Sequence, residues 1–256
     1  MQRRQNYQNF VLYSVLALIA TFAFLFVRNL DKRNSETNTN YQQQLQQSPT
    51  GGNQKIRNFR EAKKLANKFY QHRNFKTFYC GCEFRRGHID TRTCSYTPIK
   101  PNDQRSKRLE WEHVVPISYL GRNIKAWKYG DSRCRKRNGR SYKGRRCARK
   151  VSPEFNKMEA DLYNLVPSVG EVNKLRENFP IGLVSKSESF PFGCETKIKR
   201  GRIEPRDEVK GFLARIYKYM HKAYPGNNII NSRNRALIEE WDRKYPPTEH
   251  EKARNA

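Results

Sequence analysis

The chain has 256 residues and carries 52 lysines and arginines against 24 acidic residues, a formal charge of +28. This length suffices for one good-sized domain with accessory segments, and the charge favours a polyanionic partner, either nucleic acid or an anionic membrane surface. The sequence contains no P-loop, no Gly-x-Ser-x-Gly motif and no aromatic RNA-recognition motif, which excludes the NTPases, serine hydrolases and RNA-recognition domains built on them.

The N-terminal region predicts export. Residues 10–27 form an apolar run that only three hydroxyl-bearing residues interrupt, and Arg3 and Arg4 precede it. Such a run nearly crosses a hydrocarbon core of about 30 Å, so residues 1–27 are either a signal peptide or a transmembrane anchor. No clean Ala-x-Ala cleavage site follows the run, which tilts the interpretation toward an uncleaved anchor in the inner membrane.

A polar segment separates this leader from the folded domain. Residues 28–55 are rich in Asn, Gln, Ser and Thr and cannot bury enough apolar surface to fold, so they predict a flexible linker. The domain is expected over 56–256. It should begin with an amphipathic helix over 56–71, because apolar residues recur there at steps of three and four: Ile56, Phe59, Ala62, Ala66 and Phe69.

The cysteines predict a disulfide framework. Their even number suits an oxidising compartment, and Cys80-x-Cys82 has the wrong spacing for a zinc knuckle. Residues 78–84 read as a short strand with both of these cysteines on one face. Proximity in sequence allows only Cys134 and Cys147 to be named as a pair. The disulfide candidates are Cys80, Cys82, Cys94, Cys134, Cys147 and Cys194.

The segment 110–116, Glu-Trp-Glu-His-Val-Val-Pro, combines a carboxylate that can hold a hard cation with an imidazole that can accept a proton near neutral pH. These two residues are Glu112 and His113. Val114 and Val115 favour an extended backbone. Neighbouring side chains on a strand point to opposite faces, so both residues can face one site only where the backbone turns. Composition and spacing do not supply that turn.

Residues 133–150 hold ten lysines and arginines and no acidic residue, between Cys134 and Cys147. Gly139 and Gly144 interrupt any regular element. A run of this kind is often only a solvated loop. Because it separates two stretches rich in oxygen ligands, a phosphate-binding loop closed by a disulfide is the better interpretation.

Three helices are expected after this loop. Ser152-Pro153 is a helix start, with a capping hydroxyl and a proline at the first helical position. Its buried stripe is Phe155, Met158, Leu162 and Leu165, with Asn164 able to reach inward from the position next to Leu165. A second amphipathic helix is expected over 204–224, and a short last one around Leu237, Ile238 and Trp241.

The signature stretches taken together resemble the endonuclease I family, exported Mg²⁺-dependent nucleases of the ββα-metal type with little sequence preference. The similarity runs from about residue 56 to 249, in order and with family-like gaps. It is carried by EWEHVVP, by DLYNLVPSVGEVN with the RENF that follows, by FYCGC at 78–82, and by EPxxxVKGFLARIYKYM at 204–220.

The resemblance implies an α+β fold, mainly helical and stabilised by disulfides, in which a small β-sheet carries a ββα-metal nuclease motif. It implies a monomeric, exported enzyme, periplasmic or extracellular, that hydrolyses DNA to 5′-phosphate products. Membrane association would be confined to residues 10–27. Mg²⁺ is the expected cofactor, with Mn²⁺ or Ca²⁺ as alternatives, and the sequence leaves RNA open as a second substrate.

The resemblance also implies site roles. Glu112 and Asn164 would bind the metal, and His113 would be the general base. Asp161 would support these residues without binding the metal itself. Family members place a phosphate-binding arginine just before the second cysteine of the basic loop; Arg145 matches best and Arg146 nearly as well. Further phosphate contacts are expected from Arg133, Arg135, Arg146 and Arg149.

Two other readings of the sequence remain. One is an exported DNA-binding or uptake protein whose nuclease site has decayed, although Glu112, His113 and Asn164 are all present. The other is a membrane-anchored structural protein whose positive charge holds anionic lipid or cell-wall polymers. Metal-dependent nicking of DNA separates the first from an enzyme, and binding to liposomes but not DNA would identify the second.

Overall fold

The computed structural model describes residues 28, 51–71, 75–249 and 251–252. The predicted leader at 1–27 and most of the predicted linker lie outside these residues. In the described part of the chain, no helix has the length and apolar character needed to cross a membrane. Asn53, which we assigned to the linker, is bound to the domain, because its side-chain amide donates to the carbonyl oxygen of Lys157 at 2.9 Å.

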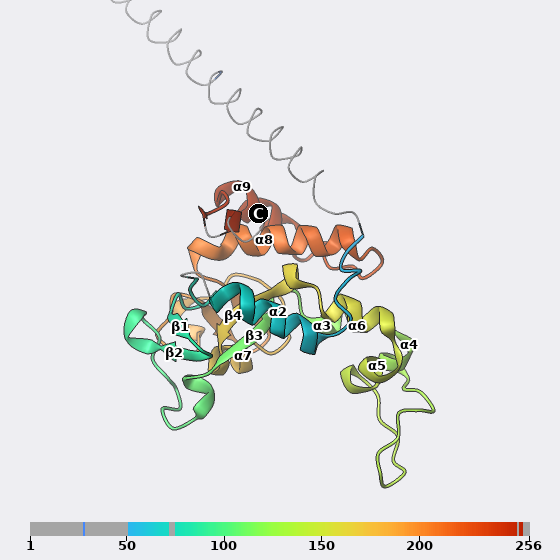
Figure 1. The fold of residues 1–256 in the computed structure, drawn as a ribbon. Coiled ribbons are helices and arrows are strands. Elements are labelled where there is room, and N and C mark those ends of the chain that lie inside the picture. The colour runs from blue at the N-terminus through green and yellow to red at the C-terminus, as the bar shows by residue number, and fades with distance from the viewer. Residues whose placement is uncertain (1–27, 29–50, 72–74, 250, 253–256) are drawn as a thin grey trace, which may run out of the picture. The chain divides into compact units, whose positions relative to one another are not determined.

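The fold is α+β, with helices around short antiparallel sheets of two strands each (Figure 1). These sheets pair β1 (Glu83–Arg85) with β2 (His88–Asp90), β3 (Leu109–His113) with β4 (Leu165–Val169), and β5 (Lys197–Lys199) with β6 (Arg202–Glu204). In the β3–β4 sheet Glu112 lies opposite Val166 and His113 opposite Leu165. Helix α7 (Gly170–Arg176) follows β4 directly.

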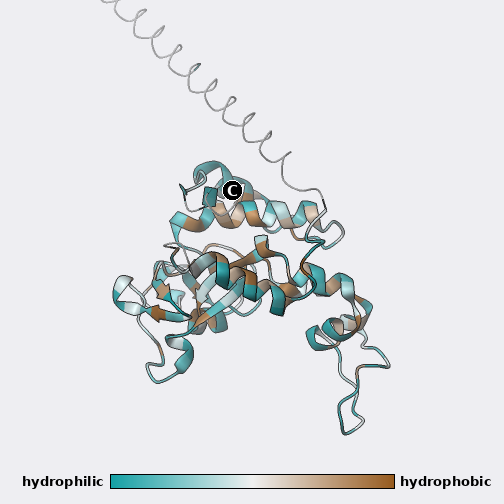
Figure 2. Cartoon of the chain, in the orientation of Figure 1, coloured by the Kyte–Doolittle hydropathy of each residue, from teal (hydrophilic) through white to brown (hydrophobic). Residues whose placement is uncertain are grey.

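The predicted helices are present with somewhat different limits. They are α2 (Phe59–Gln71), α6 (Pro153–Glu159), α8 (Asp207–Ala223) and α9 (Arg235–Lys244), joined by α3 (Ile117–Gly121), α4 (Lys125–Lys128) and α5 (Arg145–Val151). Helix α8 is amphipathic and buries Val209, Leu213, Ile216 and Met220 in the main core. By contrast with the apolar face of α8, the projecting loop before α5 is almost wholly hydrophilic (Figure 2).

Helix α6 begins as predicted, since the Ser152 hydroxyl accepts a hydrogen bond from the Phe155 amide at 3.1 Å. It ends six residues earlier than its apolar stripe suggested. A 3₁₀ turn at Leu162–Asn164 follows, and Leu165 opens strand β4. The prediction of one continuous helix through Leu165 was wrong because this residue pairs with His113 across the sheet, a contact that local periodicity does not encode.

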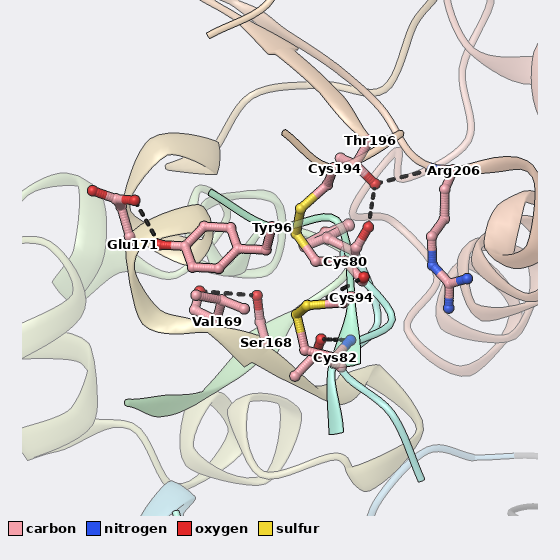
Figure 3. The surroundings of a disulfide bond; sticks show 12 residues. Cys80, Cys82, Cys94, Tyr96, Ser168, Val169, Glu171, Cys194, Thr196 and Arg206 are labelled. Carbon is pink, nitrogen blue, oxygen red and sulfur yellow. Dashed lines mark hydrogen bonds between the residues drawn. A yellow bond between two sulfur atoms is a disulfide. The ribbon is translucent and has the colours of Figure 1, made fainter. Parts of the chain in front are cut away.

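The disulfides are Cys80–Cys194, Cys82–Cys94 and Cys134–Cys147, which confirms the predicted pair. The predicted strand over 78–84 was wrong, because only 83–85 is extended, after a turn at 78–80. Figure 3 shows the first two bridges beside each other, with Thr196 hydrogen-bonded to the turn at 78–80 that precedes β1. The Thr196 hydroxyl donates to the carbonyl oxygen of Tyr79 at 2.6 Å. This packing fixes Tyr79, whose side chain reaches the site described next.

Candidate active site

Glu112 and His113 lie at the end of β3 and line the same cavity of about 700 Å³. Both are nearly buried, at 5% and 6% exposure. The strand ends at His113, and the backbone bends at Val114 and Val115 before Pro116. Consecutive side chains of a continuous strand point to opposite faces, but these two line one cavity at the place where the strand ends.

The Glu112 carboxylate is supported from inside the protein. The Tyr79 hydroxyl donates to its Oε1 at 3.2 Å, and the Arg176 Nε lies 2.8 Å from the same oxygen. Burial raises the pKa of Glu112 to about 7, while Arg176 and the Tyr79 hydrogen bond oppose that rise. Because both contacts reach Oε1, neither occupies Oε2.

Arg176 is a buried cation directly behind the site, with a side chain that is 1% exposed. It extends from the last turn of α7, and its Nη2 donates to the carbonyl oxygen of Val114 at 2.6 Å. Burial alone would lower its pKa, but the Glu112 charge raises it above the ordinary arginine value. Arg176 therefore stays charged and links α7 to both Glu112 and the bend after β3. Sequence analysis gave this residue no role.

His113 is held in one tautomer. Its Nε2 lies 2.9 Å from the carbonyl oxygen of Glu159, and a carbonyl can only accept, so Nε2 carries the proton. The other ring nitrogen, Nδ1, is then unprotonated in the neutral imidazole. Burial, with the nearby Arg145 charge, lowers the pKa of His113 to about 3. The residue is therefore a neutral base at neutral pH.

Arg145 and Arg149 approach the site as a pair on α5. The buried Glu159 carboxylate binds the Nε of Arg145 through Oε1 at 2.5 Å and the Nε of Arg149 through Oε2 at 2.6 Å. Two guanidinium groups on one carboxylate leave a net positive charge. Arg145 lines the cavity, and Arg149 lies beside Arg145 on the same carboxylate without lining the cavity. Arg146 instead lies over the Tyr142 ring at 4.6 Å. Of the two arginines that the sequence could not distinguish, Arg145 is therefore the one that lines the cavity.

The other predicted phosphate-binding arginines lie on the projecting loop. Arg133 is exposed and paired with Asp131, at 2.8 Å between Arg133 Nε and Asp131 Oδ1. Arg135 bridges to Ser141 across the loop. Neither lines the cavity that contains His113.

Asn164 does not line the cavity. Its side chain is fully buried, with Oδ1 accepting from the Val115 amide at 2.7 Å and Nδ2 donating to the Val115 carbonyl at 3.0 Å. It therefore clamps the bend after His113. Asp161 is likewise structural in its contacts, because its carboxylate accepts from the Tyr224 hydroxyl at 2.6 Å and the Tyr219 hydroxyl at 3.0 Å.

The amide that does line the cavity is Asn173, on α7. Its Nδ2 donates to Glu110 Oε2 at 3.0 Å, so Oδ1 is the atom left for another partner. Glu110 in turn is bound by Arg105 at 2.5 Å and Arg108 at 2.7 Å. Burial opposes ionisation of Glu110, but these arginines keep its pKa below the ordinary value. Glu110 thus stays an acceptor and orients the Asn173 amide.

The oxygens of Glu112 and Asn173 fit a hard divalent cation. Mg²⁺ takes oxygen ligands and usually keeps several waters, so one or two protein oxygens beside a cavity suffice. Within the described residues no cluster of three or more His, Cys, Asp or Glu side chains suggests a closed metal site. An open site with few protein ligands is the type that these residues can build.

The sequence is similar to those of known nucleases. The sequence model of the family described as Endonuclease I matches residues 34–256. Endonuclease-1 of Buchnera aphidicola subsp. Acyrthosiphon pisum is 35% identical over 204 residues, 77% of this chain and 74% of its own. An extracellular deoxyribonuclease of Aeromonas hydrophila is 36% identical over 207 residues (78% and 82%), and a periplasmic deoxyribonuclease of the same organism is 35% identical over 209 residues (79% and 81%).

Proposed function

Because the chain belongs to the endonuclease I family, we propose that it is a metal-dependent deoxyribonuclease whose active site is the cavity at the end of β3. The observation that supports this site best is the convergence of Glu112, His113, Arg145 and Asn173 on one cavity from β3, α5 and α7. In this reading β3, β4 and α7 form the ββα unit of the nuclease motif.

His113 is the general base. With Nε2–H held by the Glu159 carbonyl, Nδ1 is the nitrogen that accepts a proton from the attacking water. Its lowered pKa keeps it unprotonated across the neutral range. A positioned base of this kind contributes about 10²–10⁴-fold to a rate.

Arg145 and Arg149 bind the phosphate. Glu159 takes the Nε of each guanidinium and so fixes both side chains while leaving their terminal Nη groups to face a ligand. A guanidinium can bind two phosphate oxygens at once, which a lysine ammonium cannot do in the same geometry. Their charge would grow in importance as negative charge builds on the phosphate during attack.

Glu112 and Asn173 are the residues we propose to hold the cation, with Asn173 in place of Asn164. A divalent cation such as Mg²⁺ supplies charge neutralisation at the phosphate and at the departing 3′-oxygen. Glu110 and Arg176 position the two ligands through the contacts described above. Mn²⁺ and Ca²⁺ share the preference for oxygen and are the alternatives to test.

The products would carry 5′-phosphate and 3′-hydroxyl ends. Contacts from arginines to backbone phosphates carry no sequence information, so cleavage should show little sequence preference, and RNA is a second substrate to test. The disulfides and the names of the relatives support a periplasmic or extracellular location. We expect a monomer, with residues 1–27 directing export.

Nicking of supercoiled plasmid in Mg²⁺ and in EDTA tests this function. Wild-type protein should nick the plasmid in Mg²⁺ only. His113→Ala should lose at least about 10²-fold in rate while binding a labelled duplex as wild type does, and Glu112→Gln should abolish metal-dependent cleavage. Binding without cleavage in any divalent cation would identify the protein instead as an inactive DNA-binding or uptake protein. Equal loss of binding and cleavage in His113→Ala would contradict its role as base.

A further inference from the structure

A second cavity of about 900 Å³ adjoins the proposed active site. It is lined by the β1–β2 hairpin and by the end of α2, and it shares the side chains of Leu109 and Trp111 with the first cavity. The two cavities therefore border the same two residues of β3. None of the site roles proposed above uses the second one.

The walls of this second cavity combine positive charge with a fixed aromatic surface. Arg85 and Arg86 line it and are exposed, and within the described part of the chain neither side chain has a hydrogen bond or ion pair. Arg92 also lines it but is neutralised by Asp90 at 2.8 Å. Trp111 is held by a hydrogen bond from its indole nitrogen to Asn67 Oδ1 at 3.0 Å. A surface of this composition suits the phosphates and sugars of a nucleic acid strand.

The backbone of the hairpin is unusual at Arg86. Arg86 and Gly87 form its two-residue turn, between the paired residues Arg85 and His88, with φ values of +49° and +81°. A turn with positive φ at both positions strongly favours Asn-Gly or Gly-Gly, because left-handed backbone is unfavourable for a side chain like that of arginine. An unfavourable residue at such a position is a reason to seek a function for its side chain.

The hairpin is physically tied to the strand that carries the catalytic residues. His88 bridges to Arg108, and the Leu109 amide donates to the Gly87 carbonyl at 2.8 Å. From there β3 runs to His113, a span of about 13 Å for four extended residues. In Figure 1 the hairpin and the basic loop before α5 project from opposite sides of β3. A duplex laid across the site can meet both.

On the basis of the proposed nuclease function, we infer that the tip of the β1–β2 hairpin, Arg85 and Arg86, is a second phosphate-binding subsite. The span of about 13 Å along β3 equals about three to four base-pair steps of about 3.4 Å each. The subsite would therefore engage the DNA backbone about three to four steps from the cleaved bond. Trp111 forms the floor between the two positions. Nucleic acid is the ligand, and the contacts are to phosphate and sugar and independent of sequence.

The test measures binding of a fluorescein-labelled 24-base-pair duplex by anisotropy in EDTA, over a series of salt concentrations. Removing one phosphate-binding cation should reduce the slope of log K against log salt by about 0.9, so Arg85→Gln/Arg86→Gly should reduce it by about 1.8. Arg233→Gln/Arg243→Gln removes the same charge from residues that line neither cavity and should leave the slope unchanged. The rate at saturating DNA in Mg²⁺ should stay within about twofold of wild type in this control variant.

Arg86→Gly alone separates a binding role from a structural one. Glycine relieves the left-handed backbone, so the melting temperature should stay equal or rise while DNA affinity falls. An unchanged slope in Arg85→Gln/Arg86→Gly, or an equal change in the control variant, would overturn the subsite. Failure of wild-type protein to nick plasmid would instead refute the nuclease function, and the slope would still decide whether the hairpin binds DNA.

Discussion

The ring of Phe59 lies against the imidazole of His113, with centroids 4.8 Å apart and planes inclined by 38°. The same ring lies under the guanidinium groups of Arg145 and Arg149, at 5.6 and 5.5 Å. Phe59 is the first residue of α2. The first helix of the described domain thus contributes an aromatic surface that touches the proposed base and both proposed phosphate-binding residues.

Phe59→Ala should therefore impair the chemical step more than DNA binding. Small displacements of catalytic groups can cost up to about 10²-fold in rate, so we expect kcat to fall roughly ten- to hundredfold, while the Kd for a duplex in EDTA changes little. Single-turnover cleavage and anisotropy measure the two quantities. Phe59→Tyr keeps the ring and should restore most of the rate; a rate reduction as large in Phe59→Tyr as in Phe59→Ala would show that the ring contact is not what matters.

Asn164 and Asn173 should respond in opposite ways to replacement by alanine. Asn164→Ala leaves the buried amide and carbonyl of Val115 without partners, which should destabilise the fold by about 2–4 kcal/mol in urea denaturation. Asn173→Ala should change stability by less than about 1 kcal/mol but raise the Mg²⁺ concentration needed for half-maximal cleavage. A normal Mg²⁺ requirement in Asn173→Ala would remove this residue from the proposed cation site.

The difference between these two asparagines also shows what sequence reasoning could and could not resolve. Both belong to the same signature, and helical spacing from Phe155 to Leu165 made Asn164 look inward-facing from a helix. Asn164 is indeed buried, but it lies in a turn and not in a helix, because Leu165 pairs with His113 and opens strand β4. That contact joins segments some fifty residues apart, and no local pattern contains it.

Residues with chemically distinctive side chains were easier to predict. Glu112, His113 and Arg145, which the sequence proposed for one site, line one cavity, because a carboxylate, an imidazole and a loop arginine suggest the same chemistry wherever they occur. Arg176 and Glu110 were given no role, since a residue that orients another side chain is recognised only from the contact itself. The bridge between Cys80 and Cys194, which are 114 residues apart in the sequence, is equally non-local.

The stability that Arg176 contributes should depend largely on the presence of Glu112. Arg176→Met leaves a buried carboxylate without its partner, and breaking a buried pair in this way typically costs about 3–5 kcal/mol. Arg176→Met/Glu112→Gln removes both charges and should recover much of that stability without recovering cleavage. Urea denaturation of wild type, both single variants and the double variant gives the coupling energy. Additive effects would mean that the two side chains do not stabilise each other.

Glu204, at the end of β6, should make stability depend on pH in the acid range. Burial opposes its ionisation, but Lys197 at 2.9 Å, the Val184 amide at 2.8 Å and Lys210 at 2.9 Å outweigh it and lower its pKa. A carboxyl with a lower pKa when folded stabilises the native state above the unfolded pKa, which is about 4.3. That contribution disappears as the pH falls through the folded value.

Glu204→Gln should consequently reduce the free energy of unfolding at pH 6 and make the difference from wild type shrink as the pH falls below about 4.3, the unfolded value. The steepest change possible for one proton is about 1.4 kcal/mol per pH unit. Lys197→Met removes one of the two cations and should shrink the pH-dependent part without abolishing it. Denaturation in urea at several pH values between 6 and 3 measures this. A constant difference between wild type and Glu204→Gln across that range would show that the Glu204 pKa is the same in the folded and unfolded chains.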